Sequence, residues 1–387
     1  MTASFELPPI LEITMRRRLF NFFLGPILFA LASARLGAQG SATSEPPMPT
    51  TGLDFSGVDR FWPIVDILSK DGEPTDAQWQ ALLGTPGYRL AQMAIGKVVR
   101  EDLELAFKPS QRAVFDSLTA LPTERAFRLE HLARAPELRP QLDAFRDSVS
   151  RSAPIIEAIR TAQRFLPPGA TSVGEPPLVA FAVFRDDGYS LGPGVIVDLI
   201  HAYESNLVLF LAHEFHHAYL SLAQEKTMPD RSGQPDRPDE FPLRSAIQAL
   251  RNEGLADLID KPHPLTTTNP VRATYVTRYN DEYAKTPATL HQIDSLLVAI
   301  AADSTQMAPA GQRVRTLLWS NAHPSGAYVA RTIYEQFGVD SLFPAVTSPV
   351  AMLRTYAAAE RARGHAAPFS PAAWRVLESF EKTYWRR

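Results

Sequence analysis

One stretch of the chain places several ionisable side chains inside an otherwise apolar segment. Residues 207–224 contain neither Pro nor Gly and include the run His213-Glu214-Phe215-His216-His217. Apolar residues surround this run on most sides, which predicts a buried helix. On a helix, residues four apart lie on one face a single turn apart, so the imidazoles of His213 and His217 are expected to converge.

Burial of these side chains predicts a metal site. Two imidazoles and a carboxylate are costly to desolvate in an apolar helix unless something pairs with them, and a divalent cation would do so. The spacing H-E-x-x-H suits two zinc ligands, with Glu214 at the border of the same site. An accidental match is the plain alternative, but it would be expected most often on an exposed helix. A catalytic zinc site usually has three protein ligands and leaves a fourth position to water, so a third ligand must come from elsewhere.

A second helical pattern at residues 243–260 offers that ligand. Its Leu and Ile residues are spaced for one buried side, and Glu253 lies among them. Asp257 follows one turn later on the same face, where it would accept a hydrogen bond from the outward N–H of a ligating histidine.

These two segments carry a resemblance to a known family. His213-Glu214-x-x-His217 and Asn252-Glu253-Gly-Leu-Ala-Asp257 resemble the gluzincins, the thermolysin-like clan of zinc metallopeptidases. The resemblance implies that His213, His217 and Glu253 bind Zn²⁺, that Glu214 is the general base, and that Asp257 orients a ligand. It covers the two predicted helices and little else.

Other branches of zinc peptidases fit less well. A metzincin would carry Gly and a third His where this chain has Leu220 and Ala223. The Gly-x-Met-Glu-Asn motif of the aminopeptidase branch is absent from the sequence. As a whole, the chain is most similar in character to bacterial zinc-dependent peptidases of unassigned substrate.

A candidate oxyanion donor precedes a helical pattern near the C-terminal end. The segment His323-Pro-Ser-Gly-Ala-Tyr328 places a histidine and a tyrosine at the entrance of this helix. Zinc peptidases use a donor beyond the metal to stabilise the tetrahedral intermediate, and His or Tyr commonly provides it. The alternatives are that His323 caps the helix and that Tyr328 packs.

The N-terminal region has the form of a targeting segment. Arg16-Arg17-Arg18 precede an apolar run from Leu19 to Ala32, followed by small residues, which predicts a signal peptide over residues 1–40. Met15 suggests a later start, with residues 1–14 a misannotated extension. We therefore expect an extracytoplasmic protein, periplasmic or secreted, with no stable membrane span after cleavage. Residues 41–51 read as a linker, and the chain has no cysteine.

The remaining sequence predicts a mainly α fold with a small β-sheet (α+β). We expect an N-terminal helical region at 52–170, a zincin-like core at 171–262, and a C-terminal helical region at 263–387 that completes the cleft. The core would comprise strands at 178–184 and 195–199, the HExxH helix and the Glu-bearing helix. An edge of this sheet is a candidate for aligning an extended peptide. The proline-rich loop 225–242 is either a lid or a disordered insertion.

The predicted function is hydrolysis of peptide bonds in a peptide or protein substrate by a zinc-activated water, with Glu214 as general base. Asp257 is expected to hold the imidazole of His213 in the required tautomer. One alternative is a non-catalytic, zinc-stabilised helical binding protein, and another is a zinc hydrolase of a non-peptide amide or ester. The net charge of −3 and the lack of a basic block beyond the signal argue against a nucleic-acid partner.

Overall fold

The computed structural model describes residues 52–96, 99–121, 123–152, 154–169, 177–191, 194–227, 237–267 and 270–385. The predicted signal peptide and linker lie outside these residues. Of the loop 225–242, residues 228–236 also lie outside them.

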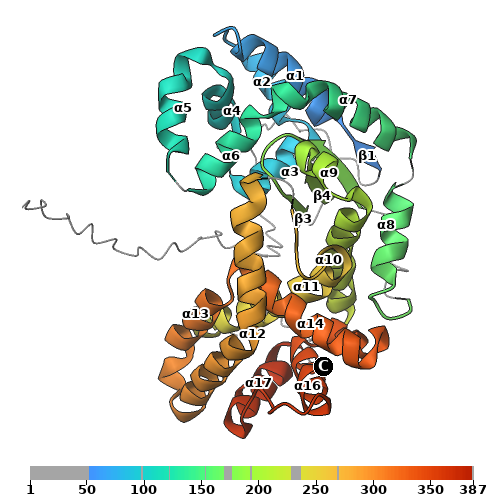
Figure 1. Ribbon diagram of the computed structural model, residues 1–387, viewed down its shortest axis with the longest axis vertical. Helices are drawn as coiled ribbons and strands as arrows, with labels where there is room; N and C mark the ends of the chain where they lie inside the picture. Colours follow the sequence, from blue (N-terminus) through green and yellow to red (C-terminus); the bar gives the residue numbers. More distant parts are fainter. Residues whose placement is uncertain are drawn as a thin grey trace, which may run out of the picture.

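Helices make up most of the molecule, and one small sheet accompanies them (Figure 1). The mainly α prediction with a small sheet is therefore confirmed. The α-helices are α1 (Ser56–Leu68), α2 (Asp76–Leu83), α3 (Pro86–Ile95), α4 (Val99–Phe107), α5 (Arg112–Thr119), α6 (Glu124–Ala133), α7 (Ala135–Arg151), α8 (Pro154–Gln163), α9 (Leu199–Glu204), α10 (Leu207–Thr227), α11 (Phe241–Asp260), α12 (Pro270–Ala302), α13 (Met307–Leu317), α14 (His323–Phe337), α15 (Phe343–Thr347), α16 (Pro349–Ala362) and α17 (Pro371–Tyr384). Short 3-10 helices include η2 (Pro238–Glu240) and η4 (Ser320–Ala322).

The sheet is followed by the short helix α9 and then by the HExxH helix α10. Its strands are β1 (Leu53–Asp54), β2 (Leu178–Ala182), β3 (Gly188–Leu191) and β4 (Gly194–Asp198), in the order β1-β2-β4-β3. β1 and β2 are parallel, as are β2 and β4, whereas β3 is an antiparallel edge strand. All residues of β2 and β4 are buried, which explains their continuous apolar sequence. β1 and β3 are too short to show a period, and the sequence did not predict them.

A buried carboxylate joins the end of β4 to the helices that follow. Asp198 caps α9 by accepting a hydrogen bond from the backbone N–H of His201 at 2.9 Å. It also bonds the ring of His131 on α6 at 2.8 Å. These contacts fix the direction in which the chain leaves the sheet and enters α9, the helix before α10.

One long helix contains an internal proline. α12 is 33 residues long and includes Pro287. A proline inside a helix removes one backbone hydrogen bond and crowds the preceding turn. Burial of apolar side chains on both sides of the proline offsets this cost, among them Tyr279, Tyr283, Leu290, Ile293 and Leu297.

Two hydrophobic clusters meet at α10 and α11. Leu211, Phe215 and Leu220 on α10 belong to a cluster built around the sheet and the N-terminal helices. Leu250 and Leu255 on α11 belong to a second cluster built from the C-terminal helices. The HExxH helix α10 and the Glu253-bearing helix α11 thus lie along the boundary between the two cores.

Two glycines let α14 approach α11 closely. A Cβ atom added to Gly254 would lie 2.6 Å from the carbonyl carbon of Gly326, and one added to Gly326 would lie 2.7 Å from the backbone nitrogen of Gly254. No side chain fits at either position without a backbone shift. This contact brings the start of α14 against Glu253, which precedes Gly254.

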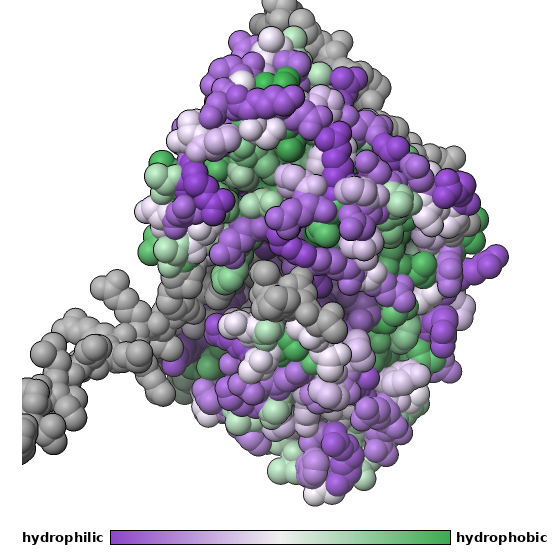
Figure 2. Space-filling view, turned by 45° about the horizontal axis from the view of Figure 1, so that its top comes forward, coloured by the Kyte–Doolittle hydropathy of each residue, from purple (hydrophilic) through white to green (hydrophobic). Residues whose placement is uncertain are grey.

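The surface between the two halves is polar. Figure 2 shows a hollow on one face, between the upper and lower parts of the molecule, with many hydrophilic residues around it.

Within the part of the chain that the structure describes, no helix has the length and apolar character needed to cross a membrane.

Candidate metal centre

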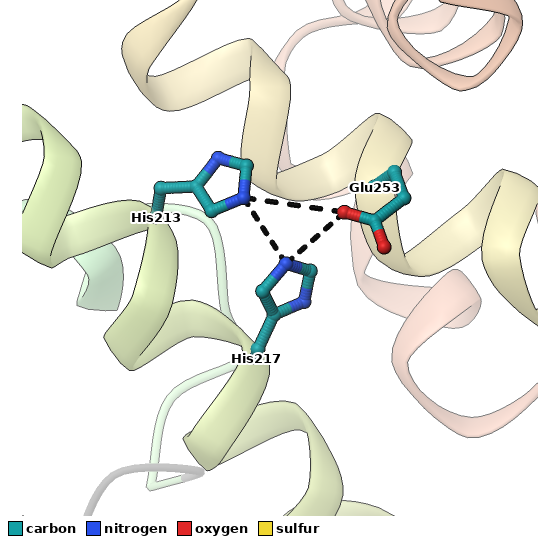
Figure 3. A group of neighbouring side chains, drawn as sticks. All are labelled: His213, His217 and Glu253. Atoms are coloured by element: carbon teal, nitrogen blue, oxygen red, sulfur yellow. Dashed lines mark hydrogen bonds and ion pairs between the residues drawn. The ribbon is translucent and has the colours of Figure 1, made fainter. Parts of the chain in front are cut away.

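The side chains of His213, His217 and Glu253 point toward one another (Figure 3). The Nε2 atoms of the two histidines lie 3.1 Å apart. Glu253 Oε2 lies 3.2 Å from His217 Nε2 and 4.0 Å from His213 Nε2. The two histidines come from α10 and the glutamate from α11. Sequence reasoning predicted this set, and the packing of the two helices brings it together.

This donor set suits zinc. Two imidazole nitrogens and one carboxylate oxygen are typical of a zinc site that leaves a position for a reacting ligand. The ligand atoms lie within 4.8 Å of one another, so a single ion would reach all of them.

The charge around the site favours a cation. Burial alone would lower the pKa of His213, but the carboxylate of Asp260 raises it to about 9. Burial would likewise raise the pKa of Glu253, yet His323, His217 and His213 lower it to about 2. Surrounding carboxylates therefore stabilise positive charge here, and a metal ion would take the place of the histidine proton.

The carboxylate that supports His213 differs from the expected one. His213 Nδ1 hydrogen-bonds to Asp260 Oδ1 at 2.9 Å, whereas Asp257 Oδ1 lies 3.6 Å from the same nitrogen. Asp260 is one further turn along α11 and was not singled out from the sequence. In the sequence, the only indication of a role for Asp260 was its spacing from Glu253 and Asp257, which places all three on one face of the helix.

Asp257 instead supports a different histidine. Its Oδ1 accepts a hydrogen bond from His323 Nδ1 at 2.9 Å and also pairs with Lys261, and Tyr279 donates to its Oδ2 at 3.2 Å. Asp257 is fully buried, and the nearby charges of His323 and Lys261 lower its pKa despite that burial. It therefore remains an anion that fixes the orientation of His323.

His323 reaches the centre, whereas the surroundings of Tyr328 are aromatic. His323 Nε2 lies 3.5 Å from Glu253 Oε2, and its ring lies over that of His213 with a centroid distance of 6.0 Å. Tyr328 packs against Tyr283 and Tyr356, with centroid distances of 5.2 and 6.3 Å. These contacts agree with the alternative that Tyr328 packs against other side chains instead of donating to an oxyanion.

Glu214 is buried beside the two histidines. Only 5% of its surface is exposed, and burial is the largest cause of its raised pKa. The charges of His213 and His217 act in the opposite direction, and that of Asp187, before β3, raises the pKa further. A carboxylate in such surroundings is suited to accept a proton.

The turn before α14 contributes a contact that the sequence did not reveal. Asn321 Nδ2 donates a hydrogen bond to Glu253 Oε1 at 2.6 Å. Ser320, Asn321 and Ala322 have φ values of 52°, 52° and 70°. Left-handed conformations in three successive non-glycine residues are costly and tend to occur at functional sites.

His216 takes no part in the centre. It is fully buried, and burial lowers its pKa to about 3, which keeps its ring neutral. Among the described residues, the groups of converging donor atoms include His213 but not His216. The fourth protein ligand required by a closed structural zinc site is therefore not supplied by this residue.

The donor set His213, His217 and Glu253 on two helices is of the kind that zinc peptidases use. The model of the family DUF5700, described as "Putative zinc dependent peptidase (DUF5700)", matches residues 79–363. The chain belongs to this family, and zinc is the cofactor that the family description gives. The matched region contains all the residues of the centre. No curated protein matches the chain, and no solved structure does.

Proposed function

We propose that this protein is a zinc-dependent peptidase that hydrolyses peptide bonds outside the cytoplasm. The observation that supports this most directly is the convergence of His213, His217 and Glu253, with Glu214 buried at their border. The extracytoplasmic location rests on the signal-like N-terminal sequence.

Each residue of the centre has a separate role in the proposed reaction. Zinc, when bound, supplies a Lewis acid that polarises the substrate carbonyl and makes water more acidic. Glu214 accepts the proton of the attacking water and delivers it to the leaving nitrogen. His323 donates a hydrogen bond to the developing oxyanion, a role supported by the contact that orients its ring against Asp257. Glu214 and His213 are buried, so bulk water screens their charges little.

The edge strand β3 is our candidate for substrate alignment. It borders α10, as shown by Gly188, where an added Cβ would lie 2.8 Å from a ring carbon of Phe210. An extended peptide pairs readily with an exposed sheet edge, which would lay its backbone beside the HExxH helix.

Metal content and turnover test the proposal together. We expect about one zinc per chain in the purified protein, and loss of most of it in His217→Ala and in Glu253→Ala. Glu214→Gln is expected to keep the zinc while hydrolysis of a peptide library falls by at least about a hundredfold. Plasma mass spectrometry and a fluorogenic peptide assay measure the two quantities.

The outcomes separate the alternatives. Zinc retained with full turnover in Glu214→Gln would overturn the general-base role. Zinc retained without peptide hydrolysis in the unaltered protein would favour the zinc-stabilised binding protein. Activity on esters or non-peptide amides alone would favour the second alternative, because the metal chemistry is common to both substrate classes. Absence of zinc after addition of the metal would overturn the zinc site itself.

A further inference from the structure

The two oxygens of Glu253 have different partners. Oε2 faces the imidazoles and lies 3.2 Å from His217 Nε2 and 3.5 Å from His323 Nε2. Oε1 accepts the hydrogen bond from Asn321 Nδ2 at 2.6 Å. The carboxylate is thus held with one oxygen toward the histidines and the other toward an amide donor.

The turn that carries Asn321 is anchored on both sides. Before it, the ring of Trp319 packs against Tyr275 with a centroid distance of 5.4 Å, and Arg278 lies 4.5 Å from the centre of the Trp319 ring. After it, Ala322 is fully buried. The backbone N–H of Ala322 donates to the carbonyl of Trp319 at 3.1 Å. These contacts hold three residues in left-handed conformations that would otherwise relax.

The residue types in this turn indicate that its strained left-handed backbone is tied to a side-chain contact. Asn tolerates a left-handed backbone better than most residues, but Ala does not, and Gly would suit all three positions with less strain. Glycine at position 321 would satisfy the backbone and provide no donor. An asparagine with φ 52° satisfies the backbone while directing an amide at Glu253.

We propose that Asn321 is a positioning residue that restricts Glu253 to single-oxygen ligation of the metal. This inference rests on the proposed zinc site. With Oε1 engaged by the amide, Glu253 offers Oε2 alone, so a coordination position stays open for the reacting groups. Without the amide, the carboxylate is free to turn both oxygens toward a cation, which would fill that position.

Zinc affinity and the visible spectrum of the Co²⁺-substituted protein test this role in the full chain. In Asn321→Gly, the glycine accepts the left-handed backbone, so folding should be retained and circular dichroism should match that of the unaltered protein. We expect its Kd for zinc, from competition with a chelating dye, to rise by about ten- to a hundredfold, because Glu253 is no longer held in a fixed orientation and the cost of ordering it on binding exceeds the gain from a second oxygen. We also expect the Co²⁺ absorption band to weaken, because higher coordination lowers its intensity.

Ala322→Gly is the matched control. It relieves strain at the adjacent residue and leaves the Asn321 amide in place, so zinc affinity and the Co²⁺ spectrum should equal those of the unaltered protein. Asn321→Asp keeps the side-chain shape but sets a carboxylate against Glu253, and it should weaken zinc binding at least as much as Asn321→Gly.

Each remaining outcome has a defined meaning. If Asn321→Gly keeps both the affinity and the spectrum, Asn321 has no positioning role, although the zinc site stands. Equal losses in Asn321→Gly and Ala322→Gly would assign the effect to the backbone and overturn the role of the amide. If the unaltered chain binds neither zinc nor Co²⁺, the proposed function fails, and this inference fails with it.

Discussion

At the scale of single residues, the orientation of His213 depends on a carboxylate that is not a ligand. Asp260 accepts the hydrogen bond from Nδ1 at 2.9 Å, which leaves Nε2 facing His217 and Glu253. Such outer contacts fix the tautomer of a ligating histidine and increase its basicity. His213 Nδ1 does not donate to Asp257, because Asp257 Oδ1 lies 3.6 Å from it and accepts the hydrogen bond from His323 instead.

We therefore expect Asp260→Asn to weaken zinc binding by about ten- to a hundredfold while the fold is retained. The amide keeps the size of the side chain but removes the negative charge that stabilises the N–H of His213. Competition with a chelating dye measures the effect. Asp281→Asn, which alters an exposed aspartate on α12, is the control and should leave zinc affinity unchanged. Equal affinity in both variants would contradict the role of Asp260.

At the scale of elements, the close contact of α11 and α14 decides where His323 and Asn321 lie. His323 and Asn321 lie shortly before Gly326 in the chain. Gly326 contacts Gly254, the residue that follows Glu253. Two helices with larger residues at this contact would be further apart, since interaxial distances depend on the side chains at the crossing.

Gly326→Ala tests this contact. Helix propensity favours alanine over glycine by about 1 kcal/mol, so in an open helix the change would stabilise the protein. Here the added Cβ would meet backbone atoms of Gly254 at 2.7 and 2.8 Å, and overpacking of this kind costs about 1–3 kcal/mol. We expect a net loss of unfolding free energy and weaker zinc binding. Gln336→Ala, on the exposed face of α14, should leave both nearly unchanged in denaturant titrations.

At the scale of the whole molecule, the centre lies where the two hydrophobic cores meet. α10 contributes its histidines from the core around the sheet, and α11 contributes Glu253 from the C-terminal core. A metal held by both helices would join the two cores. Binding to the folded state alone stabilises a protein according to the ratio of free ligand to Kd.

Zinc at a hundred times its Kd is therefore expected to raise the unfolding free energy by about 2.7 kcal/mol, and removal by EDTA should reverse the gain. Thermal unfolding with and without the metal measures the difference. His217→Ala should respond to neither addition, because it lacks a ligand. An unfolding midpoint that is independent of zinc would show that the metal does not link the two cores.

The sequence by itself determined which side chains form the candidate centre, because helical spacing is a local property. His213 and His217 share a face on any α-helix, and Glu253 and Asp257 share a face on the next one. Their burial followed from the apolar residues around them. The main strands β2 and β4 were also predictable, because a fully buried strand is continuously apolar.

Only the tertiary structure decided which carboxylate or amide forms a hydrogen bond with each residue of the centre. The choice of Asp260 over Asp257 for His213 depends on how α10 packs on α11, and differences below 1 Å settle it. Asn321 reaches Glu253 through a turn whose left-handed residues carry no sequence signal beyond a single asparagine. The glycine contact between α11 and α14 joins residues 72 positions apart, so its meaning appears only once both helices are in place. Local spacing is encoded residue by residue, whereas these contacts arise from the packing of whole elements.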